Sequence, residues 1–148
     1  MALFRRILHP SDFSSASAPA FKQAVELARA NRARLLIVHV LPPVTMVPDV
    51  YVATRIYEGL LRGHRAFGQR QLDRLVAKAR RMNVRASSVL LDFGVAYERI
   101  VRIAKSKRSH LIVMGTHGRT GFAKIALGSV AERVVTMAPC PVLTVRAG

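Results

Sequence analysis

Three glycines and one hydroxyl group stand at a spacing that suits phosphate. Gly115-Thr116-His117-Gly118 follows the apolar run 111–114, and Gly128-Ser129 comes nine residues later, before the helix-like stretch 130–135. Glycine has no Cβ, so a bulky anion can come within contact distance of backbone N–H groups. A helix N-terminus presents unpaired N–H groups and roughly half a positive charge, and Ser129 adds a hydroxyl donor. The pattern therefore predicts one half of a nucleotide site.

Each of these glycines also has an ordinary structural explanation. Gly115 and Gly118 could provide positive φ angles for a turn, and Gly128 could cap the following helix. We favour phosphate binding because three glycines stand at this spacing, with Gly121 between them and Ser129 after them. Both ends of the loop then supply N–H donors.

The segments around this loop alternate between expected strands and expected helices. Strands are expected over residues 4–9, 34–40, 84–92, 110–114 and 141–145, and helices over 19–31, about 54–82, 96–107 and from 130 onward. The run 34–40 is nearly all apolar, which is typical of a strand covered on both faces in a parallel sheet. Residues 41–49 contain three prolines and are expected to form a loop.

Five strands that alternate with four helices predict βαβ units. We therefore expect an α/β fold: a doubly wound, five-stranded parallel sheet of order 3-2-1-4-5, Rossmann-like, with helices on both faces and one domain over residues 1–148. Ligands of such sheets bind beyond the carboxyl ends of the strands, where the strand order reverses. The loop 10–14 and the glycine loop are thus expected to meet on one crevice.

The long expected helix has an apolar arc and a basic face. At about 100° per residue, one arc contains Tyr57, Leu61, His64, Gly68, Leu72, Leu75, Ala79 and Met82. The basic face includes Arg62, Arg70, Arg74, Lys78 and Arg81. We favour a solvated basic face, and contact with an acidic partner or with nucleic acid is the alternative.

Composition limits the class of protein more than its function. Of 148 residues, 51% are apolar, which argues against disorder, and the apolar runs are too short to span a bilayer. No apolar signal core follows the N-terminus, so a cytoplasmic protein is expected. The single cysteine, Cys140, excludes an internal disulfide. The net charge of +16 favours polyanionic partners, although aromatic residues make up 6% and offer no ladder for base stacking.

The motif Gly115-x2-Gly118-x9-Gly128-Ser129 resembles the nucleotide-binding signature of the universal stress protein family. The likeness covers nearly the whole chain, because segments 6–14, 36–40, 113–119 and 140–145 are also similar to the corresponding parts of that family. Family members with the full motif bind ATP, and another branch lacks it. The resemblance therefore implies an ATP-binding protein that acts as a regulatory or sensor module in a stress response.

The resemblance also implies roles for individual residues. Asp12 matches the acidic residue that contacts the ribose or adenine end, and Val40 matches the residue whose backbone meets adenine. The phosphate and ribose contacts are matched by Gly115, Gly118, Gly128, Ser129 and Val130, and the neighbouring positions are Pro10, Met114, His117 and Arg119. A Mg²⁺ or Mn²⁺ ion would be held by the phosphates rather than by a protein cage.

Several of these side chains have alternative roles. Asp12 could cap the first helix, but Ser14, Ser15 and Ser17 could do so instead. His117 could meet a phosphate or face water, and Arg119 could pair with phosphate bidentately or be solvated. The remaining histidines, His9, His39 and His64, are expected to be core or packing residues rather than catalytic ones.

Other functions remain open at this point. Slow ATP hydrolysis is one alternative, although no Walker lysine follows a glycine-rich loop. A basic nucleic-acid-binding protein is another, because of the charge, and a flavin carrier is a third, because serines crowd the loop after the first strand. The family usually dimerises, often through its last strand, and residues 142–145 at a sheet edge would favour pairing with a second copy.

Overall fold

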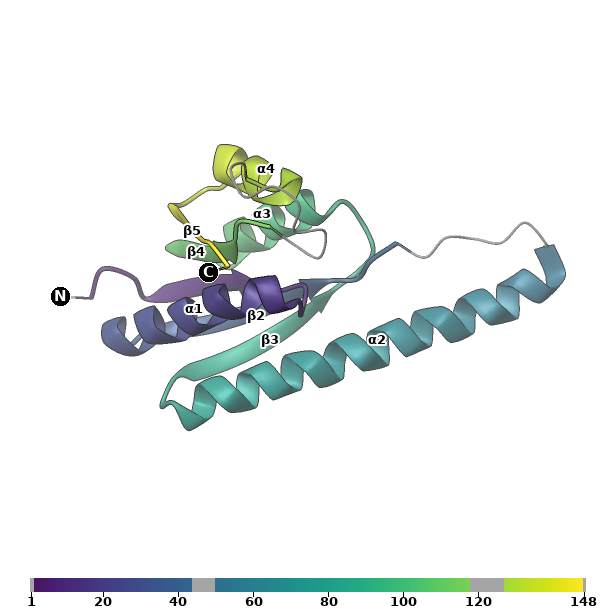
Figure 1. Cartoon of the computed structure of the whole chain (residues 1–148), viewed down its shortest axis with the longest axis horizontal. Coiled ribbons are helices and arrows are strands. Elements are labelled where there is room, and N and C mark those ends of the chain that lie inside the picture. Colours follow the sequence, from purple (N-terminus) through teal and green to yellow (C-terminus); the bar gives the residue numbers. More distant parts are fainter. Residues whose placement is uncertain (1, 44–49, 118–126, 148) are drawn as a thin grey trace.

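The computed structural model describes residues 2–43, 50–117 and 127–147. The elements follow one another as β1 (Arg6–Pro10), a short 3₁₀ helix η1 (Ser15–Ser17), α1 (Ala18–Asn31), β2 (Arg34–Val40), α2 (Val50–Arg81), β3 (Arg85–Leu91), α3 (Ala96–Ser106), β4 (Leu111–Gly115), α4 (Ser129–Met137) and β5 (Val142–Val145). Strands and helices alternate as the sequence predicts (Figure 1).

The strands form one five-stranded sheet in the order β3-β2-β1-β4-β5. Every neighbouring pair is parallel. Leu8 of β1 pairs with Leu36 of β2 on one side and with Ile112 of β4 on the other, so β1 lies at the centre of the sheet. The predicted doubly wound α/β fold and its strand order are confirmed.

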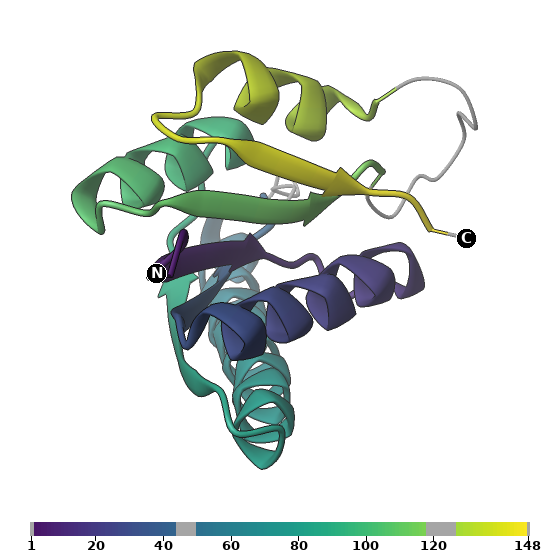
Figure 2. The same cartoon turned by 90° about the vertical axis from the view of Figure 1, so that its left-hand side faces the viewer.

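Two apolar cores lie on the two faces of the sheet, because successive strand residues point to opposite sides. Ile7 belongs to the core that contains buried residues of α1 and α2. Its neighbour Leu8 belongs to the core that contains buried residues of α3 and α4. Figure 2 shows the same division, with α1 and α2 on one side of the sheet and α3 and α4 on the other. The sheet is thus covered on both faces, which explains the nearly continuous apolar sequence of β2.

Helix α2 is 32 residues long and packs on the sheet through its second half. Leu72 and Ala79 are fully buried there. At Gly68 an added Cβ would lie 3.0 Å from Cδ1 of Leu90, so the missing side chain allows close approach to β3. Figure 1 shows the amino-terminal half of α2 extending beyond the sheet. The predicted basic face is exposed to solvent throughout.

Element boundaries differ from the sequence predictions by a few residues. Strand β1 begins at Arg6 rather than at residue 4, and it includes Pro10. Helix α2 begins at Val50, before the predicted residue 54, and it ends at Arg81, so Met82 lies beyond it and is exposed. Within the described ranges, no helix is long and apolar enough to cross a membrane.

Candidate functional site

A cavity of about 580 Å³ opens at the carboxyl ends of β1, β2 and β4. This is the point where the strand order reverses, between β1 and β4. Its walls come from the ends of these three strands and from the first residues of α3 and α4. The volume lies in the range of about 300–1,000 Å³ that is typical of small-molecule sites.

Most of the predicted site residues meet at this cavity. Nine of them line it: Pro10, Asp12, Val40, Met114, Gly115, His117, Gly128, Ser129 and Val130. The other two, Gly118 and Arg119, lie outside the described residues. Two segments more than 100 residues apart in sequence, the loop after β1 and the start of α4, thus contribute to one surface.

The start of α4 presents backbone donors to the cavity. Gly128 is its N-cap residue and has no side chain that could accept a hydrogen bond from the first turn. Its carbonyl oxygen accepts from the N–H of Glu132 at 2.9 Å, which closes the first helical turn. The N–H groups of Ser129, Val130 and Ala131 have no acceptor within the helix, as at every helix start, and these residues line the cavity. Such a helix end attracts anions.

Neither described glycine of the motif has a positive φ, and Gly128 is the one at which a side chain would lack space. Gly128 has φ −61° and ψ 158°, which any residue can adopt. An added Cβ would lie 2.9 Å from the carbonyl oxygen of Thr116, and the N–H of Gly128 donates to that same oxygen at 2.6 Å. Gly115 ends β4 without a positive φ, and its Cβ would lie 3.4 Å from the carbonyl oxygens of Ala16 and His117. The turn explanation for Gly115 is therefore wrong.

Asp12 is held in the turn that follows β1. Its Oδ1 accepts hydrogen bonds from the N–H of Ser14 at 3.0 Å and from the Ser14 hydroxyl at 2.5 Å. The Ser14 oxygen in turn accepts from the N–H of Ser17 and caps η1. Helix capping is thus the task of Ser14, and the Asp12 carboxylate lies in the wall of the cavity.

A buried histidine of β2, His39, holds this turn in place through two contacts. His39 donates from Nδ1 to the carbonyl oxygen of Ser11 at 2.7 Å. Its ring contacts the ring of Phe13 at a centroid distance of 4.2 Å. Phe13 has φ 64°, a conformation that is uncommon for a bulky residue. The loop that carries Asp12 is therefore held in a strained conformation by tertiary contacts. Sequence analysis placed His39 in the core, and it also lines the cavity.

His117 is partly buried rather than facing water. Its Nδ1 lies 3.0 Å from the hydroxyl oxygen of Thr116. Its Nε2 is buried and has no hydrogen-bond partner among the residues that the structure describes. A buried polar atom without a partner is costly, so a ligand that bonded to it would relieve that cost. Thr116, which was part of the motif but not among the predicted site residues, also lines the cavity.

Apolar side chains form the rest of the wall. Val38, Val40 and Ile100 line the cavity together with Met114. They offer a surface for a flat, weakly polar group, whereas Asp12 and the start of α4 offer an acceptor and a set of donors. One cavity thus combines an apolar wall, a carboxylate and an anion-binding helix end.

His9 is not among the residues that line the cavity. It is fully buried on β1, and its Nδ1 donates to the carbonyl oxygen of Val113 on β4 at 2.8 Å. Its Nε2 has no partner in the described part of the chain. Burial lowers the pKa of His9 to about 4, although the hydrogen bond to Val113 and the charge of Asp12 act in the opposite direction. His9 is a structural link between two central strands, as the sequence predicted for a core residue.

Comparison with known proteins agrees with this geometry. The model of the universal stress protein family matches residues 3–146. The chain is 37% identical over 145 residues to a universal stress protein of Methanocaldococcus jannaschii, a match that covers 97% of this chain and 83% of that protein.

Solved structures show the same fold. The universal stress protein UspA from Lactobacillus plantarum has a TM-score of 0.85 and 26% identity, with coverage of 99% of this chain and 100% of that chain. A universal stress protein from Archaeoglobus fulgidus in complex with dAMP has a TM-score of 0.66 and 20% identity, with coverage of 97% and 99%. Since the family model spans nearly the whole sequence and the fold agrees, this chain belongs to the universal stress protein family.

Proposed function

We propose that the cavity at the carboxyl ends of β1 and β4 binds an adenine nucleotide, with ATP as the ligand, and that the chain acts as a regulatory or sensor module in a stress response. The observation that carries this proposal is the shared position of Asp12 and the open first turn of α4 on one cavity of about 580 Å³. The dAMP complex of the Archaeoglobus fulgidus protein supports an adenine nucleotide as the class of ligand.

Each part of the nucleotide has a suitable partner in the wall. The N–H groups of the first turn of α4 and the hydroxyl of Ser129 would bind phosphate oxygens. Asp12 would accept a hydrogen bond from a ribose hydroxyl or an amino group, and the backbone of Val40 would meet adenine. The buried Nε2 of His117 would gain a partner from the same ligand. Gly118 and Arg119 stay predictions from the sequence, since both lie outside the described residues.

A Mg²⁺ or Mn²⁺ ion would be carried on the nucleotide's phosphates. Within the described ranges, no three His, Cys, Asp or Glu side chains gather into a metal cage. Asp12 is the carboxylate among the residues that line the cavity. The ion would neutralise phosphate charge, and the protein groups would position the nucleotide.

Binding should be measured by calorimetry with Mg·ATP on the wild-type protein and two variants. Ser129→Ala removes a hydroxyl donor, and Asp12→Asn removes the carboxylate charge but keeps an oxygen that can accept from Ser14. A hydrogen bond to a charged group contributes about 1.5–3 kcal/mol, so each variant should weaken binding about tenfold or more. Ser106→Ala is the matched control, because Ser106 lies at the far end of α3 and donates to Ile103.

Two results would contradict the proposal. One is the absence of heat or of any shift in unfolding temperature at millimolar ATP in the wild-type protein. The other is equal affinity in the Ser129→Ala, Asp12→Asn and Ser106→Ala proteins. An assay with labelled ATP in excess over protein on the same samples separates a binding module from a hydrolase, because a hydrolase releases more than one product molecule per protein molecule and a binding module does not.

Dimerisation through the last strand is a separate proposal. Strand β5 (Val142–Val145) lies at the end of the strand order, and Leu143 is 37% exposed. An outer strand with exposed apolar side chains can pair with a second copy. Sedimentation equilibrium would test this, and a monomer at all concentrations would contradict it.

A further inference from the structure

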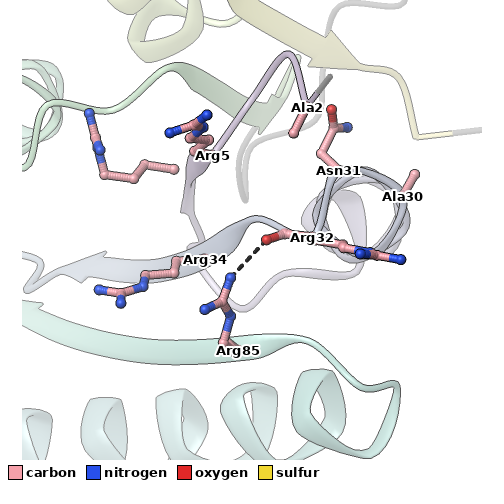
Figure 3. Close-up of a pocket in the computed structure, with 8 residues that line it drawn as sticks. Ala2, Arg5, Ala30, Asn31, Arg32, Arg34 and Arg85 are labelled. Carbon is pink, nitrogen blue, oxygen red and sulfur yellow. Dashed lines mark hydrogen bonds between the residues drawn. The ribbon is translucent and has the colours of Figure 1, made fainter.

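A second hollow lies at the amino ends of β1, β2 and β3, opposite to the strand ends that line the proposed nucleotide cavity. Its volume is about 810 Å³, and it is lined by five arginines, Arg5, Arg6, Arg32, Arg34 and Arg85, with Ala2, Ala30 and Asn31. We call it the arginine hollow. Figure 3 labels Arg5, Arg32, Arg34 and Arg85, which come from the chain before β1, the residue after α1, and strands β2 and β3; the side chains of Arg32 and Arg34 extend in opposite directions. The two cavities share no lining residue.

The sheet register brings three of these arginines into one row. Arg6, Arg34 and Arg85 are the first residues of β1, β2 and β3. Arg6 is paired with Arg34, and Arg34 is paired with Arg85. Neighbouring strands lie about 4.8 Å apart, and like charges at paired positions of adjacent strands repel. This row therefore costs stability unless an anion offsets its charge.

The charge of these arginines is not offset by any lining residue that the structure describes. None of the described residues that line the hollow is acidic. In its described part the structure shows an ion pair between Arg65 and Asp92. Asp92 follows the carboxyl end of β3, whereas the hollow lies at the amino ends of the strands. An excess of five guanidinium groups in a concave site thus remains for a ligand.

Backbone carbonyl groups hold two of the guanidinium groups in place. Arg85 donates from Nη2 to the carbonyl oxygen of Arg32 at 2.9 Å, the bond drawn in Figure 3. Arg6 donates from Nε to the carbonyl oxygen of Arg108 at 2.7 Å. Arg6 also contacts Nε2 of His110 through Nη2 at 2.9 Å. Since a guanidinium has five N–H donors, both Arg6 and Arg85 keep donors for a ligand. Partial fixation lowers the cost of ordering these side chains when an anion binds.

We propose that the arginine hollow binds a compact oligophosphate, a ligand with at least two linked phosphate groups. Guanidinium groups match phosphate oxygens with paired hydrogen bonds. Because the lining arginines come from several chain segments, a ligand with linked phosphate groups can contact more of them than a single phosphate can. No aromatic side chain is among the described lining residues, so the hollow offers no stacking surface for a base. The arginine hollow would thus recognise a phosphate chain, either as a free oligophosphate or as the phosphate tail of a nucleotide.

The site is independent of the proposed nucleotide cavity in position. Arg34 and Val40 are the first and last residues of β2 and lie in the walls of the two different cavities. They are the two ends of a seven-residue strand and thus lie about 20 Å apart. The protein could therefore hold two phosphate-bearing ligands at once, one at the amino ends of the strands and one at their carboxyl ends.

The test measures binding of sodium tripolyphosphate by calorimetry. The salt concentration is about 150 mM, which is close to physiological ionic strength. The double variant Arg34→Gln/Arg85→Gln should weaken binding at least about tenfold. The matched control Arg70→Gln/Arg74→Gln removes the same charge from the exposed face of α2 and should change the affinity less than about twofold. Orthophosphate should bind at least about tenfold more weakly than tripolyphosphate. With ATP as a further probe, a binding event that is lost in Arg34→Gln/Arg85→Gln but kept in Ser129→Ala would show that the hollow also accepts a nucleotide's phosphate tail.

Several outcomes would overturn the proposal. Equal losses in the two double variants would show that binding follows net charge alone. A loss caused by Ser129→Ala, with none caused by Arg34→Gln/Arg85→Gln, would place tripolyphosphate in the nucleotide cavity instead. Tighter binding of a mixed-sequence DNA duplex than of tripolyphosphate, with the same sensitivity to Arg34→Gln/Arg85→Gln, would assign the hollow to a nucleic-acid backbone.

Unfolding measurements separate a binding defect from a folding defect. Because the Arg34→Gln/Arg85→Gln protein lacks two repelling charges, its unfolding temperature without ligand should equal or exceed that of the wild type. Tripolyphosphate should raise the unfolding temperature of the wild type and of Arg70→Gln/Arg74→Gln, but not of the hollow variant. An equal rise in all three proteins would contradict the assignment.

Discussion

Mild acid should destabilise this fold through one buried side chain. His9 is fully buried between β1 and β4 and donates to the carbonyl oxygen of Val113. Burial lowers its pKa from 6.5 to about 4. The unfolded chain therefore takes up a proton at a higher pH than the folded chain does. The contribution of His9 to stability is fully present above about pH 6.5 and is lost as the pH falls toward 4.

The magnitude follows from the two pKa values. The full difference between 6.5 and about 4 corresponds to about 3 kcal/mol in the free energy of unfolding. Most of it falls in an accessible range: between about pH 7.5 and 5.0, the contribution of His9 should decrease by about 2 kcal/mol. Aspartates and glutamates also titrate at acid pH, so the comparison with a variant isolates the histidine.

Urea unfolding at pH 7.5 and 5.0 would measure this loss. His9→Asn keeps a donor near the position of Nδ1 but carries no titrating ring, so its stability should fall about 2 kcal/mol less over this interval than that of the wild type. Phe21→Leu is the matched control, because Phe21 packs against His9 at a ring distance of 5.8 Å and does not titrate. It should lower stability at both pH values and keep the wild-type difference. If His9→Asn shows the wild-type difference too, the assignment to His9 is wrong.

Three further variants test packing at named positions by the same urea assay. Gly128→Ala should lower stability by about 1–3 kcal/mol and weaken ATP binding, because its Cβ would lie 2.9 Å from the backbone oxygen of Thr116; unchanged stability would show that this contact relaxes freely. Gly63→Ala, where a Cβ meets nothing within 4 Å, should instead stabilise by about 0.5–1 kcal/mol. Leu72→Ala should cost about 2–5 kcal/mol, since Leu72 is a fully buried side chain of α2, and a smaller loss would mean that the space left by the side chain closes.

The strand order could be predicted because it depends on local patterns and on one general rule. Apolar runs and glycines mark each element, and alternation predicts a parallel sheet. Among the doubly wound orders, 3-2-1-4-5 is the one that brings the loop 10–14 and the glycine loop to one crevice. The same rule placed the loop 10–14 and the glycine loop at the cavity, whereas Val40 was assigned through the family resemblance; Pro10, Val40 and Gly115 each end a strand. The start of α2 was harder to predict from the sequence, because Gly59 and Gly63 lower helix propensity although the helix continues through both.

Other features depend on contacts between distant segments. The bond from His39 to Ser11 joins residues 28 positions apart, and no spacing in the sequence indicates it. The role of Gly128 rests on the position of the Thr116 carbonyl oxygen. The row of arginines is likewise invisible in the sequence, since Arg34 and Arg85 become neighbours only through the register of β2 and β3.

The two halves of helix α2 should protect their backbone amide hydrogens from exchange to different degrees. Its second half is held by buried side chains such as Leu72, so exchange of those amide hydrogens requires unfolding of the sheet itself. Its first half extends beyond the sheet, carries Gly59 and Gly63, and exposes Ile56 and Leu60. Helical segments without tertiary packing are marginal in water, so amide hydrogens there exchange by fraying from the end. Deuterium uptake should therefore fall steadily along this single helix, from Val50 toward Arg81.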